Sequence, residues 1–297
     1  MLKPSFENEF TTMELTKEFK NYLMELGYSK SSQSMLPKLT EDFLGYHNTV
    51  HPETITSSHI HEFYNYLQSR PHKRKTGALS EQYINHHVYA LRVFFNWLET
   101  TGQLRTNPMS VLRFKRPKSN HREPFTQAEI TQLFNVVQTA QENVILHLFY
   151  SCGLRRSEAE TLQIRDVHFK QQLLYVREGK GAKRRVVPMP ESVAKALEKY
   201  YLSERINQKN TIDTQAFVLN RIGSKMRGDG YNRVLKNLMA RTELLKEASL
   251  HHLRHSIATH LLERGLSIEK VRDFLGHRHL ETTQLYAKVA PIQVQNL

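Results

Sequence analysis

The sequence has 297 residues, with 42 Lys and Arg against 29 Asp and Glu, which gives a formal net charge of +13. Because a domain usually comprises about 100 to 200 residues, this length favours two domains, and the excess of positive charge favours an anionic partner such as nucleic acid. The single cysteine, Cys152, excludes a disulfide framework, and the lack of an apolar run of about 18 to 20 residues excludes a membrane span, so we expect a cytoplasmic protein.

Helical periodicity with caps and stops marks the first part of the chain, residues 1–112. Apolar residues recur there at helical spacing in four segments, at residues 12–26, 31–46, 57–68 and 80–101. Four amphipathic helices with short connections predict a small helical bundle. Basic residues fall on its expected outer faces, namely Lys30, Lys38, His72, Lys73, Arg74, Lys75, His86, His87 and Arg92. They could bind DNA phosphates or form an ordinary solvated surface, and this domain alone favours neither interpretation.

A basic stretch without periodicity follows at residues 113–124 and contains Pro117 and Pro124. Loss of periodicity together with proline predicts a linker between two domains. Lys115 and Arg116 within it are candidate contacts to a DNA backbone, although linkers are commonly polar without any such role.

The remaining residues, 125–297, predict a second domain that opens with a capping box between Thr126 and Glu129. Helices are expected at residues 127–137, 141–152, 156–163, 191–203, 229–244, 251–264, 267–275 and 280–288. Strands are expected at residues 167–169, 173–177 and 185–188. The predicted fold class is mainly α with a small antiparallel β-sheet, in which a four-helix domain precedes an α+β domain.

Two polar motifs lie before and within the expected sheet. Arg155 follows Gly153 and stands at the start of a helix, where backbone N–H groups favour an anion. It could bind phosphate or simply cap the helix. Lys180, Lys183 and Arg184 lie in a glycine-containing hairpin turn, which could approach a ligand closely or be merely solvated.

Two further motifs lie in the C-terminal helices. His251 and Arg254 are three positions apart at the start of a helix, so they share a face and can approach one ligand. His251 and His255 also have the spacing of a metal pair, but the helix lacks the glutamate of a zincin motif, so we predict no metal. His277 and Tyr286 follow, and each alone would be interpreted as a capping or packing residue.

As a set, six of these residues match what metal-free phosphoryl transfer to a side chain requires: Arg155, Lys180, His251, Arg254, His277 and Tyr286. Two arginines can neutralise a pentacoordinate phosphate with forked donors. A lysine can protonate the leaving oxygen, and two histidines can donate to the phosphate or move the proton of the nucleophile. A tyrosine can supply the attacking oxygen, and the surrounding positive charge compensates for a phenol pKa of about 10.

At these residues the chain resembles the tyrosine recombinase, or phage integrase, family, and in particular its Xer-like members. The motifs that carry the resemblance are Gly153-Leu154-Arg155-Arg156-Ser157-Glu158, Gly179-Lys180-Gly181, His251-His252-Leu253-Arg254-His255, Leu275-Gly276-His277 and Thr282-Thr283-Gln284-Leu285-Tyr286. Their order along the chain agrees with the family. The N-terminal helices resemble its SAM-like core-binding domain, so the resemblance covers nearly the whole sequence.

The resemblance implies a site-specific recombinase that closes around double-stranded DNA. Tyr286 would attack the scissile phosphate to give a 3′-phosphotyrosine and a free 5′-hydroxyl, while His251 and His277 assist. The protein would be a monomer or weak dimer free in solution, and a homotetramer on two recombination sites would exchange strands through a Holliday junction, without cofactor, metal or ATP. Accessory DNA-bending proteins could take part. The expected setting is the nucleoid of a bacterium or archaeon, as part of a mobile genetic element or in the resolution of chromosome dimers.

The resemblance also assigns further roles. Arg155 and Arg254 would hold the nonbridging oxygens, and Lys180, or Lys183 in its place, would act as general acid. Glu158, from the same motif as Arg155, would orient the site. The expected DNA contacts are Lys73, Arg74, Lys75, Arg92, Lys115, Arg116, Lys183 and Arg184.

Three other functions stay open. A type IB topoisomerase shares the chemistry but relaxes supercoils as a monomer, and the compact Xer-like layout disfavours it. The full set of catalytic residues disfavours a DNA-binding regulator that has lost catalysis, and the absence of a zinc motif disfavours a metal-dependent hydrolase. The sequence identifies neither the DNA target nor whether the outcome is integration, excision, inversion or dimer resolution.

Overall fold

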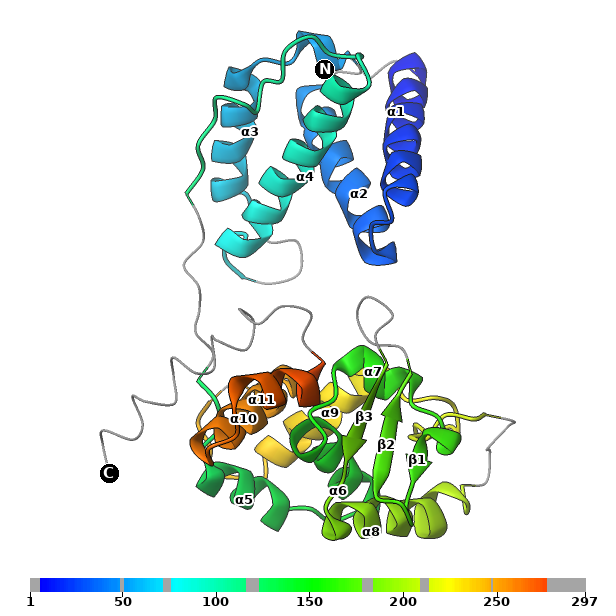
Figure 1. The fold of residues 1–297 in the computed structure, drawn as a ribbon. Coiled ribbons are helices and arrows are strands. Elements are labelled where there is room, and N and C mark those ends of the chain that lie inside the picture. Colours follow the sequence, from blue (N-terminus) through cyan, green and yellow to red (C-terminus); the bar gives the residue numbers. More distant parts are fainter. Residues whose placement is uncertain are drawn as a thin grey trace. The chain divides into compact units, whose positions relative to one another are not determined.

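The computed structural model describes residues 6–48, 51–71, 76–115, 123–177, 184–208, 214–246 and 248–276. The chain divides into two compact units, Met1–Asn120 and His121–Leu297 (Figure 1). Helices predominate in both units, and a small antiparallel sheet belongs to the second. The predicted fold class is therefore confirmed.

The N-terminal unit is a bundle of helices, named α1 (Phe6–Glu25), α2 (Lys30–His47), α3 (Ser57–Ser69) and α4 (Glu81–Thr100) (Figure 1). The four predicted helices are confirmed, although α1 begins at Phe6 rather than at residue 12. Ser29 caps α2 and Ser80 caps α4, because each side-chain oxygen accepts a backbone N–H of the first helical turn at 3.2 Å. These caps are local sequence signals, which explains why the helix starts were predictable.

The core of this unit is aromatic and includes one residue that the sequence placed on the surface. Phe94 and Phe95 are fully buried, with ring centroids 5.2 Å apart. His87 in α4 is fully buried as well, so its prediction as an exposed basic residue is wrong. Its ring packs edge-on against Phe63, and its Nε2 lies 3.8 Å from Oδ2 of Asp42. Burial lowers the pKa of His87 to about 4, despite the nearby carboxylate, so the ring is neutral at pH 7.

The second unit contains helices α5 (Gln127–Asn135), α6 (Ala140–Leu146), α7 (Arg156–Thr161), α8 (Glu191–Tyr200), α9 (Gly228–Met239), α10 (Leu250–Glu263) and α11 (Ile268–Leu275). Its strands are β1 (Val167–His168), β2 (Leu173–Val176) and β3 (Arg185–Pro188). They pair antiparallel in the order β1-β2-β3, with Leu174 opposite Val187. Both residues are fully buried, so this face of the sheet contributes to the core. The three predicted strands are confirmed to within one residue at each end.

Two predicted α-helices continue as π-helices. The helix expected over residues 141–152 is α6 followed by a π-helix at His147–Ser151, and the Cys152 N–H donates to the carbonyl of His147 at 2.8 Å. A second π-helix, Tyr201–Arg205, extends α8. Hydrophobic periodicity cannot separate these forms, because one widened turn changes the residue spacing very little.

The end of α9 was predicted too late. The helix ends at Met239, and the prediction of helix over residues 240–244 is wrong. The backbone N–H groups of Arg241 and Thr242 donate to carbonyls three residues back, and the Thr242 hydroxyl donates to the Met239 carbonyl at 2.8 Å and accepts the Leu244 N–H at 3.4 Å. The helix predicted at residues 280–288 lies outside the described residues.

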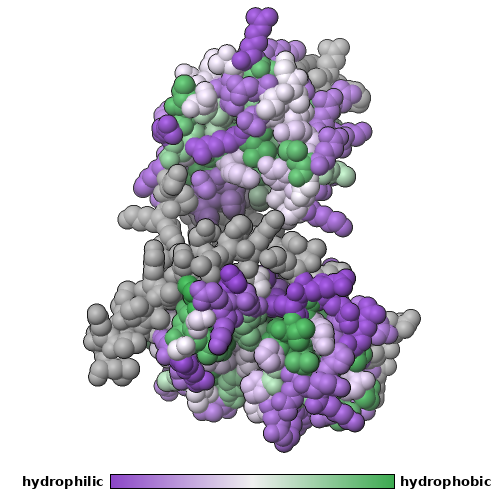
Figure 2. Space-filling view, in the orientation of Figure 1, coloured by the Kyte–Doolittle hydropathy of each residue, from purple (hydrophilic) through white to green (hydrophobic). Residues whose placement is uncertain are grey.

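One helix of the second unit contacts an edge of its sheet. Helices α10 and α11 pack against each other, and α11 contacts β3, one of the two edge strands (Figure 1). The face drawn in Figure 2 is mainly hydrophilic, with hydrophobic residues scattered over it. Within the described part of the chain, no helix combines the length and apolar character needed to cross a membrane.

Candidate active site

A glycine turn after the first π-helix sets the position of the first predicted arginine. Gly153 has a φ of +57°, in the left-handed region. A Cβ atom there would lie 2.9 Å from Leu275 Cδ2 and 3.2 Å from Phe274 Cε1, so the turn requires glycine to pack against α11. The chain then reaches Arg155, which is the N-cap residue of α7, as the sequence predicted.

Arg155 is held both by its own helix and by α11. Its backbone N–H donates to Oε2 of Glu158 at 2.8 Å, and its Nη1 donates to Oε1 of the same carboxylate at 2.7 Å. Its Nη2 donates to the carbonyl oxygen of Gly276 at 2.9 Å. Its side chain is 22% exposed.

Arg254 reaches the same place from the first turns of α10. Its side chain is only 1% exposed. Its Nη1 donates to the carbonyl of Gly153, and its Nη2 donates to the carbonyl of Leu275 at 2.6 Å. Nη1 also lies 3.8 Å from Oε2 of Glu158. The two arginines, which are 99 positions apart (254 − 155) in the sequence, therefore share one carboxylate and the end of one helix.

Glu158 lies between these arginines and is fully buried. A third arginine, Arg185 at the start of β3, forms a bidentate ion pair with it, with both N–O distances at 2.8 Å. Burial alone would raise the pKa of this carboxyl, but the hydrogen bonds and charge of Arg185, with help from Arg155 and Arg254, lower it to about 2. Glu158 is therefore ionised at neutral pH. We call Arg155, Arg185, Arg254 and Glu158 the arginine cluster.

The cluster converges on the last turn of α11. The carbonyl oxygens of Phe274, Leu275 and Gly276 each accept a hydrogen bond from a different arginine of the cluster. The C-terminal carbonyls of a helix have no partners within the helix and carry partial negative charge, which explains why they attract guanidinium groups. Gly276 ends the helix with a φ of +64°. In the sequence, His277 follows at once.

Sequence reasoning did not predict a role for Arg185. A signal existed, because Arg185 and Val187 are two positions apart in a strand and so face the same side, and Val187 is fully buried. An arginine on a buried face requires an acidic partner. The partner, Glu158, is 27 positions away in the sequence and could not be inferred from strand alternation alone.

The histidines at the start of α10 differ in their surroundings. His251 is exposed, although Arg254 one turn later is buried. His252 closes the start of the helix, because its Nδ1 accepts the backbone N–H of Ser249 at 3.0 Å. This cap corresponds to a capping box in which an imidazole replaces the usual carboxylate, and the sequence analysis missed it.

The other predicted residues fall into two groups. Of the DNA contacts, Arg92, Lys115 and Arg184 are exposed, and Lys115 lies 3.7 Å from the carboxylate of Glu81. Nine predicted residues lie outside the described part of the chain: His72, Lys73, Arg74, Lys75, Arg116, Lys180, Lys183, His277 and Tyr286. Among the described residues, no group of three or more His, Cys, Asp or Glu side chains could hold a metal ion.

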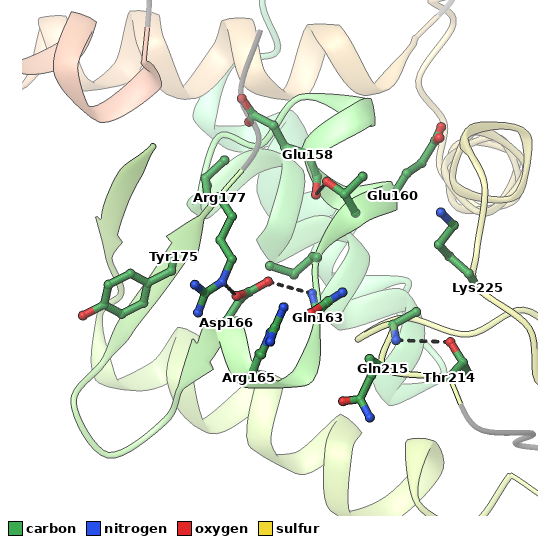
Figure 3. A pocket seen from close by; sticks show the side chains of 14 residues that line it. Glu158, Glu160, Gln163, Arg165, Asp166, Tyr175, Arg177, Thr214, Gln215 and Lys225 are labelled. Atoms are coloured by element: carbon green, nitrogen blue, oxygen red, sulfur yellow. Dashed lines mark hydrogen bonds and ion pairs between the residues drawn. The ribbon is translucent and has the colours of Figure 1, made fainter. Parts of the chain in front are cut away.

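A cavity of about 300 Å³ lies beside the cluster, between α7, β2 and residues 214–216. Figure 3 shows Arg177 directed towards Asp166, with Lys225 on the opposite side of the view. Arg177 and Asp166 form an ion pair, and Asp166 also accepts the backbone N–H of Gln163 at 3.0 Å. Acidic and basic side chains both line this cavity, unlike the cluster, where cations predominate.

Comparisons with known proteins agree over both units. Residues 123–292 match the model of the phage integrase family, and residues 15–103 match the model of the phage integrase N-terminal SAM-like domain. The chain is 35% identical over 215 residues to a tyrosine recombinase of Thermosipho africanus, covering 71% of this chain and 72% of that protein. It is 30% identical over 257 residues to tyrosine recombinase XerC of Oceanobacillus iheyensis, covering 84% of this chain and 81% of that protein.

Solved structures show the same fold. The crystal structure of XerA recombinase is 26% identical, with a TM-score of 0.53, and the match covers 96% of this chain and 98% of that one. The Tn1549 transposon integrase in complex with transposon right end DNA is 18% identical, with a TM-score of 0.73 over 92% of this chain and 94% of that one.

Proposed function

Because this chain belongs to the phage integrase family of tyrosine recombinases, we propose that it cleaves and rejoins duplex DNA at specific sites through a bond between Tyr286 and a backbone phosphate. The observation that carries the proposal is the convergence of Arg155 and Arg254 on the last turn of α11. The sequence continues from that turn into His277 and reaches Tyr286 nine positions later (286 − 277). Attack by a phenol on a phosphodiester requires forked cations that bind the phosphate, and Arg155 and Arg254 can supply them.

In the proposed first step, the phenolic oxygen of Tyr286 attacks the scissile phosphorus. The bond from phosphorus to the 5′ oxygen breaks, and Lys180 gives that oxygen a proton. Arg155 and Arg254 stabilise the charge on the nonbridging oxygens, while His251 and His277 donate to the phosphate or take the phenolic proton. The products are a 3′-phosphotyrosine and a free 5′-hydroxyl.

In the second step, the 5′-hydroxyl of a partner strand attacks the phosphotyrosine and releases the enzyme. The number of phosphoester bonds is unchanged, so the reaction requires no ATP. The arginines supply the positive charge that metal ions supply in many phosphoryl-transfer sites, so we infer activity in the presence of EDTA. Four protomers on two DNA sites would make the exchange reciprocal, through a Holliday junction.

DNA binding is assigned to basic residues of both units. Arg92 and Lys115 in the N-terminal unit and Arg184 in the second are exposed, as phosphate contacts must be. The net charge of +13 supports a polyanionic partner. The DNA complexes named for the Tn1549 integrase concern a protein of the same fold, and they support duplex DNA as the partner here.

Covalent trapping tests the proposal and identifies the DNA target in the same experiment. Sheared genomic DNA of the source organism is incubated with the protein, denatured with SDS, and the protein-linked fragments are precipitated and sequenced. We expect fragments that share one sequence and end at a 3′-phosphotyrosine. Tyr286→Phe should trap none, whereas Tyr175→Phe, a matched control in β2, should trap the same fragments. Equal trapping by Tyr286→Phe would refute the proposal.

A second experiment identifies the general acid. Once a site has been found, Lys180→Ala and Lys183→Ala are compared on a normal substrate and on one with sulfur as the 5′ leaving atom. Sulfur leaves without protonation, so it should rescue Lys180→Ala alone. Rescue of Lys183→Ala instead would identify Lys183 as the general acid.

A further inference from the structure

Arg185 has no role in the proposed chemistry, yet it is among the most constrained side chains near the site. It is the first residue of β3 and is 8% exposed, whereas Arg184 before it is exposed. All three guanidinium nitrogens donate: Nη1 and Nη2 to the two oxygens of Glu158 at 2.8 Å, and Nε to the carbonyl of Phe274 at 2.9 Å. One side chain thus joins β3, α7 and α11.

The contacts of Arg185 determine what its neighbours can do. Glu158 is shared between Arg185, Arg155 and Arg254. Without Arg185, both carboxylate oxygens would be open to Arg155, whose guanidinium could close onto them as a fork. Arg155 would then turn its donors away from a phosphate. The carbonyl of Phe274 would also lose its partner, and with it one of the bonds that fix the last turn of α11.

The net charge of the arginine cluster also supports a role for Arg185 in cleavage. Three guanidinium groups and one carboxylate give the cluster a net charge of +2 (3 − 1). Attack of a phenolate on a phosphodiester produces a pentacoordinate phosphorus with two negative charges, which this net charge matches. Loss of Arg185 would reduce the net charge of the cluster to +1.

We propose that Arg185 is a positioning residue for strand cleavage: it neutralises Glu158 and fixes the end of α11, so that Arg155 and Arg254 keep the orientation in which they can bind the phosphate. This role rests on the proposed function. It assigns Arg185 to the reaction without contact to DNA, and it predicts that the residue acts on the cleavage step rather than on DNA affinity.

The test compares variants on two suicide substrates that differ only at the scissile phosphate, one normal and one with an uncharged methylphosphonate. Arg185→Met should cleave the normal substrate about 100-fold more slowly at saturating DNA, with DNA affinity changed by less than about threefold. The methylphosphonate carries one negative charge less, so we expect Arg185→Met to lose about tenfold less of its cleavage rate there than on the normal substrate. A general loss of folded protein would lower the cleavage rates on both substrates by the same factor.

Two further variants complete the design. Arg185→Lys keeps the charge but cannot make three planar contacts, so its cleavage should be slow on both substrates to the same extent. The fraction of each variant that binds DNA separates this pattern from a loss of folded protein. Arg241→Met, which breaks an ion pair with Glu142 elsewhere in the second unit, should leave both DNA affinity and cleavage unchanged.

The outcomes are distinct. Absence of a Tyr286 adduct with the wild-type protein overturns the proposed function. Wild-type adduct with normal cleavage by Arg185→Met, or with an equal loss on both substrates, overturns the positioning role alone.

Discussion

Replacing Glu158 by glutamine removes the only negative charge of the arginine cluster while keeping the size of the side chain. The fall of the pKa of Glu158 from 4.5 to about 2 corresponds to about 3 kcal/mol of stabilisation of its charged form by the folded protein. Breaking a buried ion pair by removing one partner costs about 3 to 5 kcal/mol, which agrees. We therefore expect Glu158→Gln to lower the unfolding free energy of the second unit by about 3 kcal/mol at pH 7.

Urea unfolding with two probes measures this loss. Trp97, the only tryptophan, lies in the N-terminal unit, so its fluorescence reports that unit, while hydrogen exchange of peptides from α10 and α11 reports the second. Only the second signal should shift in Glu158→Gln. The contribution is present above pH 4.5 and is lost as the pH falls to about 2, so wild type and variant should converge in acid.

Glu160→Gln is the matched control for this prediction. Glu160 lies in the same helix, its side chain is 29% exposed, and it pairs with Arg156 at 3.7 Å. A partly solvated pair of this kind contributes less than about 1 kcal/mol. If the two glutamine variants lost the same free energy, or if Glu158→Gln stayed within about 1 kcal/mol of wild type, the argument from the buried cluster would be refuted.

Three other predictions follow from buried groups. Lowering the pH from 7 to 5 should destabilise the N-terminal unit, because His87 takes up a proton below pH 6.5 in the unfolded state but only near pH 4 in the folded state. The urea unfolding transition followed by Trp97 fluorescence measures this loss of stability. An equal dependence of stability on pH in His87→Leu would contradict the prediction. Gly153→Ala should lower the unfolding free energy more than Gly265→Ala, as urea unfolding will show. Both glycines have a positive φ, but only a Cβ atom at position 153 would meet other atoms, the nearest at 2.9 Å. Equal losses would show that the neighbouring side chains move away from the new Cβ atom. Cys152 is buried, and burial raises the pKa of its thiol to about 12. It should therefore react with iodoacetamide in urea and not in the native protein, as measured by mass spectrometry. Rapid labelling of the native protein would contradict its burial.

The sequence predicted the elements well where the signals are local. Helix starts at Ser29, Ser80 and Thr126 follow from caps that act within three residues. The late end assigned to α9 and the two π-helices show the limit, because there a hydroxyl or one extra backbone residue decides the hydrogen bonding. Hydrophobic periodicity contains no information about a capping hydroxyl or an extra residue in a turn.

His87 shows a different kind of error. It shares its helical face with Ile84, Val88 and Leu91, all buried, so the spacing i, i+3, i+4 and i+7 placed it in the core. The prediction instead followed residue type and grouped it with His86. Spacing was the better guide, because burial keeps the ring neutral and makes its basic character irrelevant.

The assembly of the arginine cluster could not be read from spacing, because Arg155, Arg185 and Arg254 come from a helix start, a strand and a second helix. Several of their N–H groups already donate to Glu158 and to the carbonyls at the end of α11. In the proposed reaction, a ground-state phosphate would therefore compete with these acceptors, with little net gain. The transition state adds a negative charge that a carbonyl oxygen cannot match, so these arginines would favour it over the bound substrate, and that difference accelerates cleavage.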